Sequence, residues 1–402
     1  MNRSLILAWM LLQNSLAFAL MVGTGEVDIT PPLGTTSAGY YDRSCGMTSS
    51  HDPLLATAIV IETNDTCIAL CGVDNLGFTH DMVEAIRTLV SSQAGLEKCE
   101  IFVGSSHTHS GGGAFLNIPV VGKMLAGEYN PTITQDYVEK TAKAIIMAFD
   151  SRQEAKIGVG YSKGPGIQLF RSAWPKDVTP SNDLTVVKIT TKNDEPLAVI
   201  FNYAMHPTVL RASNLAFSAD MIGYARNALR ELLGADVQPV YFNGAQAEIV
   251  PNSCNNTFDE AKHLGDELAH SVNGIWNDIP VREDVNIRVH QDSFSFVPQA
   301  TPQGFVLPMD KYHSEVNVIV VDDIHAFATI PGELSICLEQ SLKLAAASLG
   351  YAHLSVIGLT NDAHGYILTR EAWRHPTYEA SLSFGGECHG EAICEKVMEL
   401  LK

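Results

Sequence analysis

Two histidines separated by one residue stand in a glycine-rich stretch of the chain. His107 and His109 lie within residues 104–113, directly after the apolar residues 101–103. In an extended backbone, residues two apart project to the same side, so the pattern predicts that both imidazoles face one direction. Because imidazole is a common metal ligand and a common general base, this pair could bind a metal or move a proton.

Two more groups of this kind follow other apolar runs. His206 comes after residues 199–205, and Glu333 comes after residues 330–332. A catalytic zinc ion needs about three protein ligands and one open position, and His107, His206 and Glu333 could supply that set. For a single histidine a hydrogen-bonded structural role is the commoner one, and Glu333 could equally be a carboxylate that the dipole of a following helix stabilises.

The elements that must position these groups are strands that alternate with amphipathic helices. Runs rich in Val, Ile and aromatic residues predict strands, and apolar residues at three- and four-residue spacing predict helices. The predicted strands are residues 66–73, 99–104, 156–161, 184–190, 197–203, 238–242, 286–296, 316–330 and 354–359. The predicted helices are residues 80–92, 134–149, 219–233, 257–273 and 334–348. We therefore predict an α/β (α+β) fold in which helices pack outside β-sheets and strand ends converge on one cleft.

The composition is that of a globular protein with a large core. Of the 402 residues, 46% are hydrophobic and 18% are charged, which is too little charge for a disordered chain. No linker or low-complexity tract marks a boundary, so residues 20–402 are predicted to form one domain. The formal net charge of −19 gives no attraction for nucleic acid or anionic lipid, and it favours a neutral or cationic ligand.

The N-terminus has the form of an export signal. An apolar stretch at residues 5–12 is followed by the sequence Ala-Phe-Ala that ends at Ala19, a small-x-small pattern typical of signal-peptidase sites. We predict a signal peptide at residues 1–19 and a secreted or periplasmic protein. The alternative is a buried N-terminal strand or helix. No later stretch is long and apolar enough to span a bilayer, so no transmembrane segment is predicted in the mature chain.

Seven short stretches carry a further signal: residues 23–32, 105–111, 169–172, 202–208, 330–333, 365–367 and 378–381. They resemble motifs of the neutral/alkaline non-lysosomal ceramidases, in the order in which that family shows them. The resemblance covers nearly the whole chain after residue 19. It implies the catalytic domain of that family, which is a large mixed β-sheet with flanking helices.

The resemblance also implies roles for individual residues. The zinc ligands that it implies, for one ion per chain, are His107, His206, Glu333 and Tyr366. The same resemblance puts His109 and Arg171 beside the scissile amide. Without it, the residues alone would not single out Tyr366 as a ligand.

Two features depart from the family's pattern. The family has Gly-Asp-Val-Ser-Pro-Asn beside the metal, whereas residues 247–252 read Ala-Glu-Ile-Val-Pro-Asn. Val250 has no nucleophilic or hydrogen-bonding group, so a mechanism that needs the family's serine hydroxyl is unavailable. Glu248 takes the place of the aspartate, where it could orient a histidine, act as a base or be a solvated loop carboxylate. The sequence also stops soon after residues 378–381, so the C-terminal immunoglobulin-like domain of full neutral ceramidases is not expected.

Together these features predict a zinc-dependent amidohydrolase, most simply one that cleaves ceramide into sphingosine and a fatty acid. In this hypothesis zinc lowers the pKa of bound water toward ~7 and polarises the amide carbonyl, His109 is the general base, and Arg171 stabilises the oxyanion. The expected partner is a small lipid-like substrate such as ceramide, with peripheral contact to a membrane and none to nucleic acid.

Three other functions stay open. A zinc hydrolase that acts on another N-acyl amide or on an ester would keep the zinc ligands, while the part of the site that contacts the substrate would differ. A non-catalytic, lipid-binding relic of the family would explain Val250 but not the retained ligands. A serine hydrolase ranks last, because we identify no Gly-x-Ser-x-Gly elbow and Ser110 beside His109 has no evident orienting carboxylate.

Overall fold

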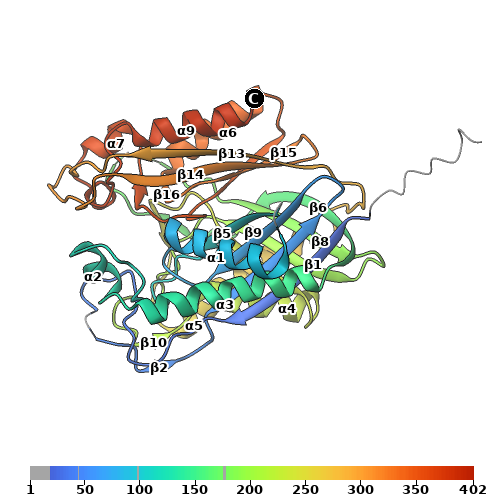
Figure 1. The fold of residues 1–402 in the computed structure, drawn as a ribbon, viewed down its shortest axis with the longest axis horizontal. Helices are drawn as coiled ribbons and strands as arrows, with labels where there is room; N and C mark the ends of the chain where they lie inside the picture. The colour runs from blue at the N-terminus through green and yellow to red at the C-terminus, as the bar shows by residue number, and fades with distance from the viewer. Residues whose placement is uncertain (1–18, 44, 97–98, 175–177) are drawn as a thin grey trace, which may run out of the picture.

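Helices and sheets form four layers in the structure, which is a computed structural model (Figure 1). It describes residues 19–43, 45–96, 99–174 and 178–402, so the predicted signal peptide lies outside the described residues except for Ala19. The layers are a pair of helices, a four-stranded sheet, an eight-stranded sheet and a second group of helices. Within the described part of the chain, no helix is both long and apolar enough to cross a membrane.

The eight-stranded sheet has the strand order β11-β9-β8-β6-β1-β3-β4-β5. Its strands are β1 (Met21–Asp28), β3 (Leu55–Glu62), β4 (Cys67–Val73), β5 (Cys99–Ser105), β6 (Gln153–Lys163), β8 (Asp183–Thr191), β9 (Pro196–Tyr203) and β11 (Gln238–Asn243). The pairs β4–β5 and β9–β11 are parallel and the other pairs are antiparallel. The prediction of a large mixed sheet is confirmed.

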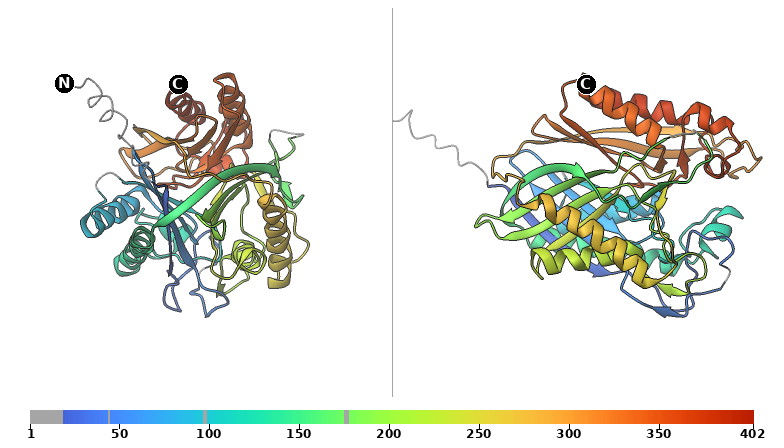
Figure 2. Two further views of the ribbon diagram at one scale, coloured as in Figure 1. Left: turned by 90° about the vertical axis from the view of Figure 1, so that its right-hand side faces the viewer. Right: turned by 180° about the vertical axis from the view of Figure 1, so that it is seen from behind.

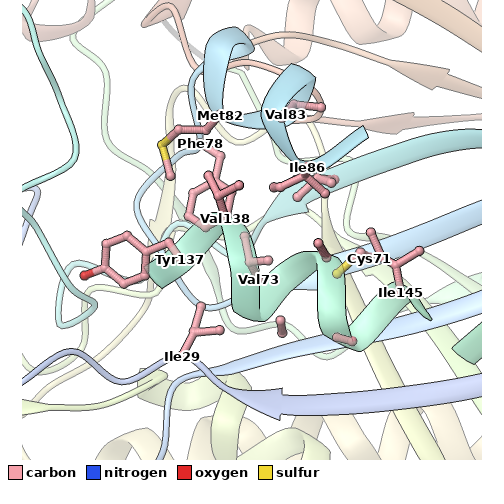
Figure 3. Packing of buried hydrophobic residues seen from close by; sticks show 14 of the residues in the cluster. Ile29, Cys71, Val73, Phe78, Met82, Val83, Ile86, Tyr137, Val138 and Ile145 are labelled. Carbon is pink, nitrogen blue, oxygen red and sulfur yellow. The ribbon is translucent and has the colours of Figure 1, made fainter. Parts of the chain in front are cut away.

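Helices α1 (His80–Ala94) and α3 (Pro131–Asp150) cover the outer face of β3, β4 and β5, and α4 (Asp220–Leu233) and α5 (Phe258–Trp276) cover that of β8, β9 and β11. Figure 3 shows part of the first of these two cores, where Ile86 and Ile145 meet Cys71 and Val73 of β4. Both helices of this core have polar side-chain caps, Thr79 before α1 and Asn130 before α3. The five predicted helices all form, and their ends lie within three residues of the predicted ones.

Strand β1 was not predicted, and its glycines explain why. Gly23 and Gly25 face the backbone of α3, where a Cβ atom would collide with the carbonyl oxygens of Ala148 and Ala144. Glycine therefore lets the helix approach the strand closely, although glycine also weakens the strand signal in the sequence.

The four-stranded sheet has the order β13-β14-β15-β17. Its strands are β13 (Ile287–Phe296), β14 (Tyr312–Val321), β15 (His325–Thr329) and β17 (His353–Ile357), and helices α6 (Ile336–Ser348) and α9 (His389–Leu400) cover its outer face. The single strand predicted at residues 316–330 is wrong. Asp322 and Asp323 adopt φ values of 55° and 58° and turn the chain back, so this stretch belongs to two antiparallel strands. Asp tolerates the left-handed region better than most residues, which makes the pair a turn signal.

A third core lies between the two sheets. It joins side chains of both, such as Ile59 and Phe102 from one sheet with Ile319 and Phe327 from the other. The larger sheet is also bent, because β11 comes back into contact with β4 and β5. The second ribbon views show the two sheets and their outer helices from the end and from behind (Figure 2).

Short elements complete the fold around the ends of the strands. They are β2 (Ser49–Ser50), β7 (Gln168–Phe170), β10 (Ala216–Phe217), β12 (Ile249–Pro251), β16 (Glu333–Leu334), β18 (Tyr366–Ile367), α2 (Val121–Ala126), α7 (Arg370–Arg374) and α8 (Tyr378–Ser381). The two-stranded ladders β7–β12 and β16–β18 carry the residues that the next section describes.

Candidate metal centre and pocket

Three imidazoles meet beyond the ends of β5 and β9. The rings of His107 and His109 have centroids 4.9 Å apart, and those of His107 and His206 are 4.7 Å apart. One ring nitrogen from each lies within 4.8 Å of the others, and all three side chains are buried or nearly so. This cluster could bind a metal.

The rings of His107 and His109 lie together, but not for the predicted reason. Strand β5 ends at Ser105, and His107 has a left-handed φ of 70° in place of an extended one. The His107 N–H donates to the carbonyl of Asn75 at 2.9 Å, which helps to hold this conformation. A non-glycine residue in the left-handed region is strained by roughly 1 kcal/mol or more, and such strain is found preferentially at functional sites.

Asn243 joins the two loops that carry the histidines. Its side-chain amide donates to the carbonyls of Ser106 at 3.1 Å and Met205 at 2.7 Å, one residue before His107 and His206 respectively. Since the amide is fully buried, both hydrogen bonds are shielded from water. Asn243 therefore fixes the spacing of the two imidazoles.

Glu333 and Tyr366 come to the cluster as a pair. They are direct partners in the parallel ladder of β16 and β18, so their side chains start on the same side. The Glu333 Oε2 atom lies 3.4 Å from His107 Nε2 and 3.0 Å from His206 Nε2. Glu333 precedes α6, but its carboxylate faces the imidazoles, so the alternative of a carboxylate stabilised by the helix dipole does not describe its contacts.

The protons on these imidazoles can be placed from their other contacts. His107 Nδ1 lies 2.7 Å from the carbonyl of Leu76, and His206 Nδ1 lies 2.8 Å from the carbonyl of Ile249. A carbonyl only accepts, so each Nδ1 must carry the proton and each Nε2 presents a lone pair. Burial lowers the pKa of His107 to about 4 and that of His206 well below its usual value, which keeps both rings neutral. Two lone pairs therefore face the Glu333 Oε2 atom, for which the described residues supply no hydrogen-bond donor.

That arrangement fits a bound cation. Lone pairs that face one another repel, and a divalent metal ion bound between them would make such a set favourable. Two ligand sets are compatible with the geometry, one with all three histidines and one with Glu333 in place of His109. The shorter contacts of Glu333 and its missing donor favour the second set.

Arg171 is fixed beside this cluster at the end of β7. Its Nη2 atom donates to Tyr366 Oη at 2.9 Å and to the carbonyl of Ala247 at 2.8 Å, and it lies 3.4 Å from His206 Nε2. Its Nε atom donates to the buried carboxylate of Glu379 at 3.0 Å. Glu379 was not predicted as a site residue, although it lies in the recognised stretch at residues 378–381. The structure thus adds a carboxylate that orients the guanidinium.

His109 differs from its neighbours because neither of its ring nitrogens has a hydrogen-bond partner among the described residues. Its ring lies against that of Tyr40, with centroids 4.8 Å apart, and a Cβ atom at Gly39 would collide with it. Burial, followed by the neighbouring imidazoles, lowers its pKa well below the usual value, so the ring is neutral. A neutral, unpartnered imidazole at the edge of a pocket can accept a proton.

A mainly apolar pocket opens beside these residues. Its polar lining includes His107, His109, Glu333 and Tyr366. The apolar part is made by Leu76, Phe115, Leu116, Ile118, Val121, Leu125, Leu307, Leu359, Leu382 and Phe384. A pocket of this kind, with a few polar groups in an apolar lining, is typical of sites for small apolar ligands.

The side chain of Glu248 contacts the start of helix α6. Its side chain is 1% exposed, and Oε2 accepts a hydrogen bond at 3.1 Å from the backbone N–H of Ile336, the first residue of α6. Glu248 is therefore not a solvated loop carboxylate. Within the described part of the chain it is also not seen to contact an imidazole. Val250 is buried in β12, where it pairs with Leu169 of β7.

We expect Glu248→Gln to change the pH dependence of stability and to leave turnover within about threefold of the wild type. Burial raises the pKa of Glu248 from 4.5 to about 7. The folded state then binds the proton more tightly than the unfolded state, so the contribution of Glu248 to stability is full below pH 4.5 and falls by up to about 3 kcal/mol as the pH rises to 7. Glutamine cannot ionise, so the unfolding free energy of the variant, measured by urea titration at several pH values, should lack this decline. A turnover loss of about 100-fold with an unchanged pH dependence would restore a catalytic role.

One sequence pattern was overlooked and turns out not to be a nucleophile elbow. Residues 160–164 read Gly-Tyr-Ser-Lys-Gly, which has the Gly-x-Ser-x-Gly spacing. Ser162 lies inside strand β6, and its hydroxyl donates to the carbonyl of Lys163 at 3.3 Å. An elbow needs a sharp turn between a strand and a helix, so this serine does not have the required setting.

Comparison with known proteins agrees with the resemblance. The sequence profile described as neutral/alkaline non-lysosomal ceramidase, N-terminal, matches residues 20–250, which is more than half of the chain. Neutral ceramidase from Pseudomonas aeruginosa has a similar structure, with a TM-score of 0.82 and 14% identity over 95% of this chain and 74% of that chain. A ceramidase complexed with C2 is similar, with a TM-score of 0.81 and 14% identity over 95% of this chain and 75% of that chain. The chain therefore belongs to the neutral/alkaline non-lysosomal ceramidase family, and its fold supports a ceramidase-like hydrolase.

Proposed function

We propose that the chain is a zinc-dependent amidohydrolase of lipid-like N-acyl amides, with ceramide as the first substrate to test. The observation that carries the proposal is the Glu333 carboxylate. Its Oε2 atom receives no hydrogen bond within the described part of the chain, while the lone pairs of His107 and His206 face it at 3.4 and 3.0 Å. Nitrogen and oxygen ligands with an open position are typical of catalytic zinc.

In this proposal His107, His206, Glu333 and Tyr366 hold the ion. Zinc, when bound, would acidify water and polarise the substrate carbonyl. The apolar lining of the pocket takes the hydrocarbon part of the substrate, which leaves the amide beside His109 at the polar end.

His109 is proposed to move the protons. Its free ring nitrogens can take a proton from the attacking water and return it to the leaving amine, which splits the C–N bond without leaving a charged amide nitrogen. Arg171 is proposed to stabilise the oxyanion that develops on the carbonyl, and Glu379 orients the guanidinium for that role.

Val250 favours a second candidate function, the hydrolysis of another N-acyl amide or of an ester. The side chain that replaces the family's serine is apolar and buried, so the substrate side of the site differs from that of the ceramidases it resembles. The polar groups proposed for catalysis are retained, and they would serve either substrate class.

We also propose that residues 20–402 act as one exported domain after removal of residues 1–19. The pattern Ala-Phe-Ala before Leu20 supports this proposal. N-terminal sequencing of the protein from its native host should begin at Leu20, and an intact Met1 would contradict it.

The test combines metal content with turnover. Zinc per chain would be measured in the purified protein, together with hydrolysis of a fluorescent short-chain ceramide and of a panel of N-acyl amides and esters. Stoichiometric zinc with ceramide turnover supports the first candidate, and zinc with turnover of a different amide or ester supports the second. Protein prepared with zinc that binds none would overturn both.

A further inference from the structure

Two chain segments line the pocket and also expose apolar side chains to solvent. One is the loop and helix α2 at residues 116–126, and the other is the loop at residues 297–311 between β13 and β14. Both lie at the same end of the molecule in the front view and in the view from behind (Figures 1 and 2). We call these two segments the rim.

Each rim segment turns some residues into the pocket and others into solvent. Val121 and Leu307 line the pocket and pack in one apolar cluster with Phe384. Val120, directly before Val121, is 80% exposed, and Val306, directly before Leu307, is 56% exposed. The further exposed apolar rim residues are Met124, Val297, Phe305 and Met309. Single exposed hydrophobic residues are ordinary, whereas a group of them around the mouth of an apolar pocket marks an interaction surface.

The charge of the rim differs from that of the rest of the chain. Residues 116–126 contain one charged residue, Lys123, and residues 297–311 contain Asp310 and Lys311, so the rim has a formal charge of +1 in a chain of −19. Lys123 is moreover paired with Glu128 just beyond α2. An almost uncharged, apolar rim on a strongly acidic protein suits a surface that carries no net charge.

We propose that the rim docks on the surface of an uncharged or zwitterionic lipid bilayer, so that a lipid-like substrate enters the pocket directly from the membrane. The entry of substrate from the membrane rests on the proposed function, whereas docking on the membrane can be measured without turnover. The net charge of −19 disfavours anionic membranes, which would repel the protein. Exposed Val, Met and Phe side chains next to a lipid pocket are suited to partial insertion at the lipid headgroup level.

The test compares vesicle binding of the wild type and of the triple variant Val120→Ser/Phe305→Ser/Val306→Ser. None of these side chains lines the pocket. Leu344→Ser is the control, because Leu344 on α6 is 75% exposed and lies outside the rim. With phosphatidylcholine vesicles in a sedimentation assay, we expect the wild type and the control to bind and the triple variant to lose at least about tenfold in affinity.

Several outcomes would overturn the proposal. These are a wild type that does not bind the vesicles, a triple variant that binds as well as the wild type, and a preference for anionic phosphatidylserine vesicles. Rim-dependent dimers in analytical ultracentrifugation would identify a second copy of the chain as the occupant instead. Vesicle binding is measured without turnover. The binding result can therefore be interpreted even if the protein hydrolyses none of the tested substrates.

Turnover then separates docking from chemistry. The triple variant should hydrolyse a soluble short-chain substrate at the wild-type rate and a vesicle-embedded one about tenfold more slowly. A loss of the same size on both substrates would show damage to the pocket and would also overturn the proposal.

Discussion

His107→Asn should abolish metal binding and lower turnover by at least about 1,000-fold. The substitution removes an Nε2 lone pair that faces Glu333 at 3.4 Å. The Nδ1 atom of His206 cannot take its place, because it is bonded to the carbonyl of Ile249. Asparagine is chosen because it tolerates the φ of 70° that His107 adopts, whereas alanine would add strain. The measurement is zinc per chain by mass spectrometry, with thermal unfolding to confirm that the variant is folded.

The control for this prediction is His290→Asn, which changes an exposed histidine on β13 in the same way. It should keep about one zinc per chain and full activity. If the His107 variant retained stoichiometric zinc, the ion would have to lie elsewhere, and the proposed centre would be wrong.

His109→Gln should keep the metal and lose turnover by about 100- to 10,000-fold. The expectation follows from the ring nitrogens of His109, which have no hydrogen-bond partner among the residues that the structure describes. Glu333, in contrast, contacts both other imidazoles. Glutamine is close to histidine in size and can hydrogen-bond, but it does not accept a proton near neutral pH. Zinc content and turnover are measured on the same preparation.

This variant also decides between the two ligand sets that the geometry allows. Loss of zinc along with activity would identify His109 as a ligand in a set of three histidines. Retention of both zinc and activity would remove His109 from the mechanism and leave the proton transfers to another group.

The sequence predicted many of the helices and strands, although not every uninterrupted apolar run was recognised. Helices α1 and α5 began within one residue of the predicted positions because each has a polar cap before an amphipathic run. Strand β1 was missed because Gly23 and Gly25 serve contact with α3, a tertiary requirement that lowers the local strand signal. Strand β3 was missed although its apolar run carries a strand signal.

Part of the candidate site was also predictable from apolar runs in the sequence. His107, His206 and Glu333 follow apolar runs, and ends of buried strands are where polar groups meet. Tyr366 required the resemblance, because its place beside Glu333 comes from the register of β16 and β18, which local patterns do not encode. The hydrogen bond that Glu248 accepts from Ile336 could not be predicted either, because it depends on where the start of α6 lies in the fold.

The origin of the four residues proposed as zinc ligands has a consequence for folding. His107 and His206 follow strands of the eight-stranded sheet, whereas Glu333 and Tyr366 follow strands of the four-stranded sheet. An ion held by all four would therefore cross-link the two sheets, and its binding energy would add to the cohesion between them. The metal would then stabilise the contact between the two sheets as well as take part in catalysis. The eight-stranded and the four-stranded sheet would unfold together in one cooperative transition.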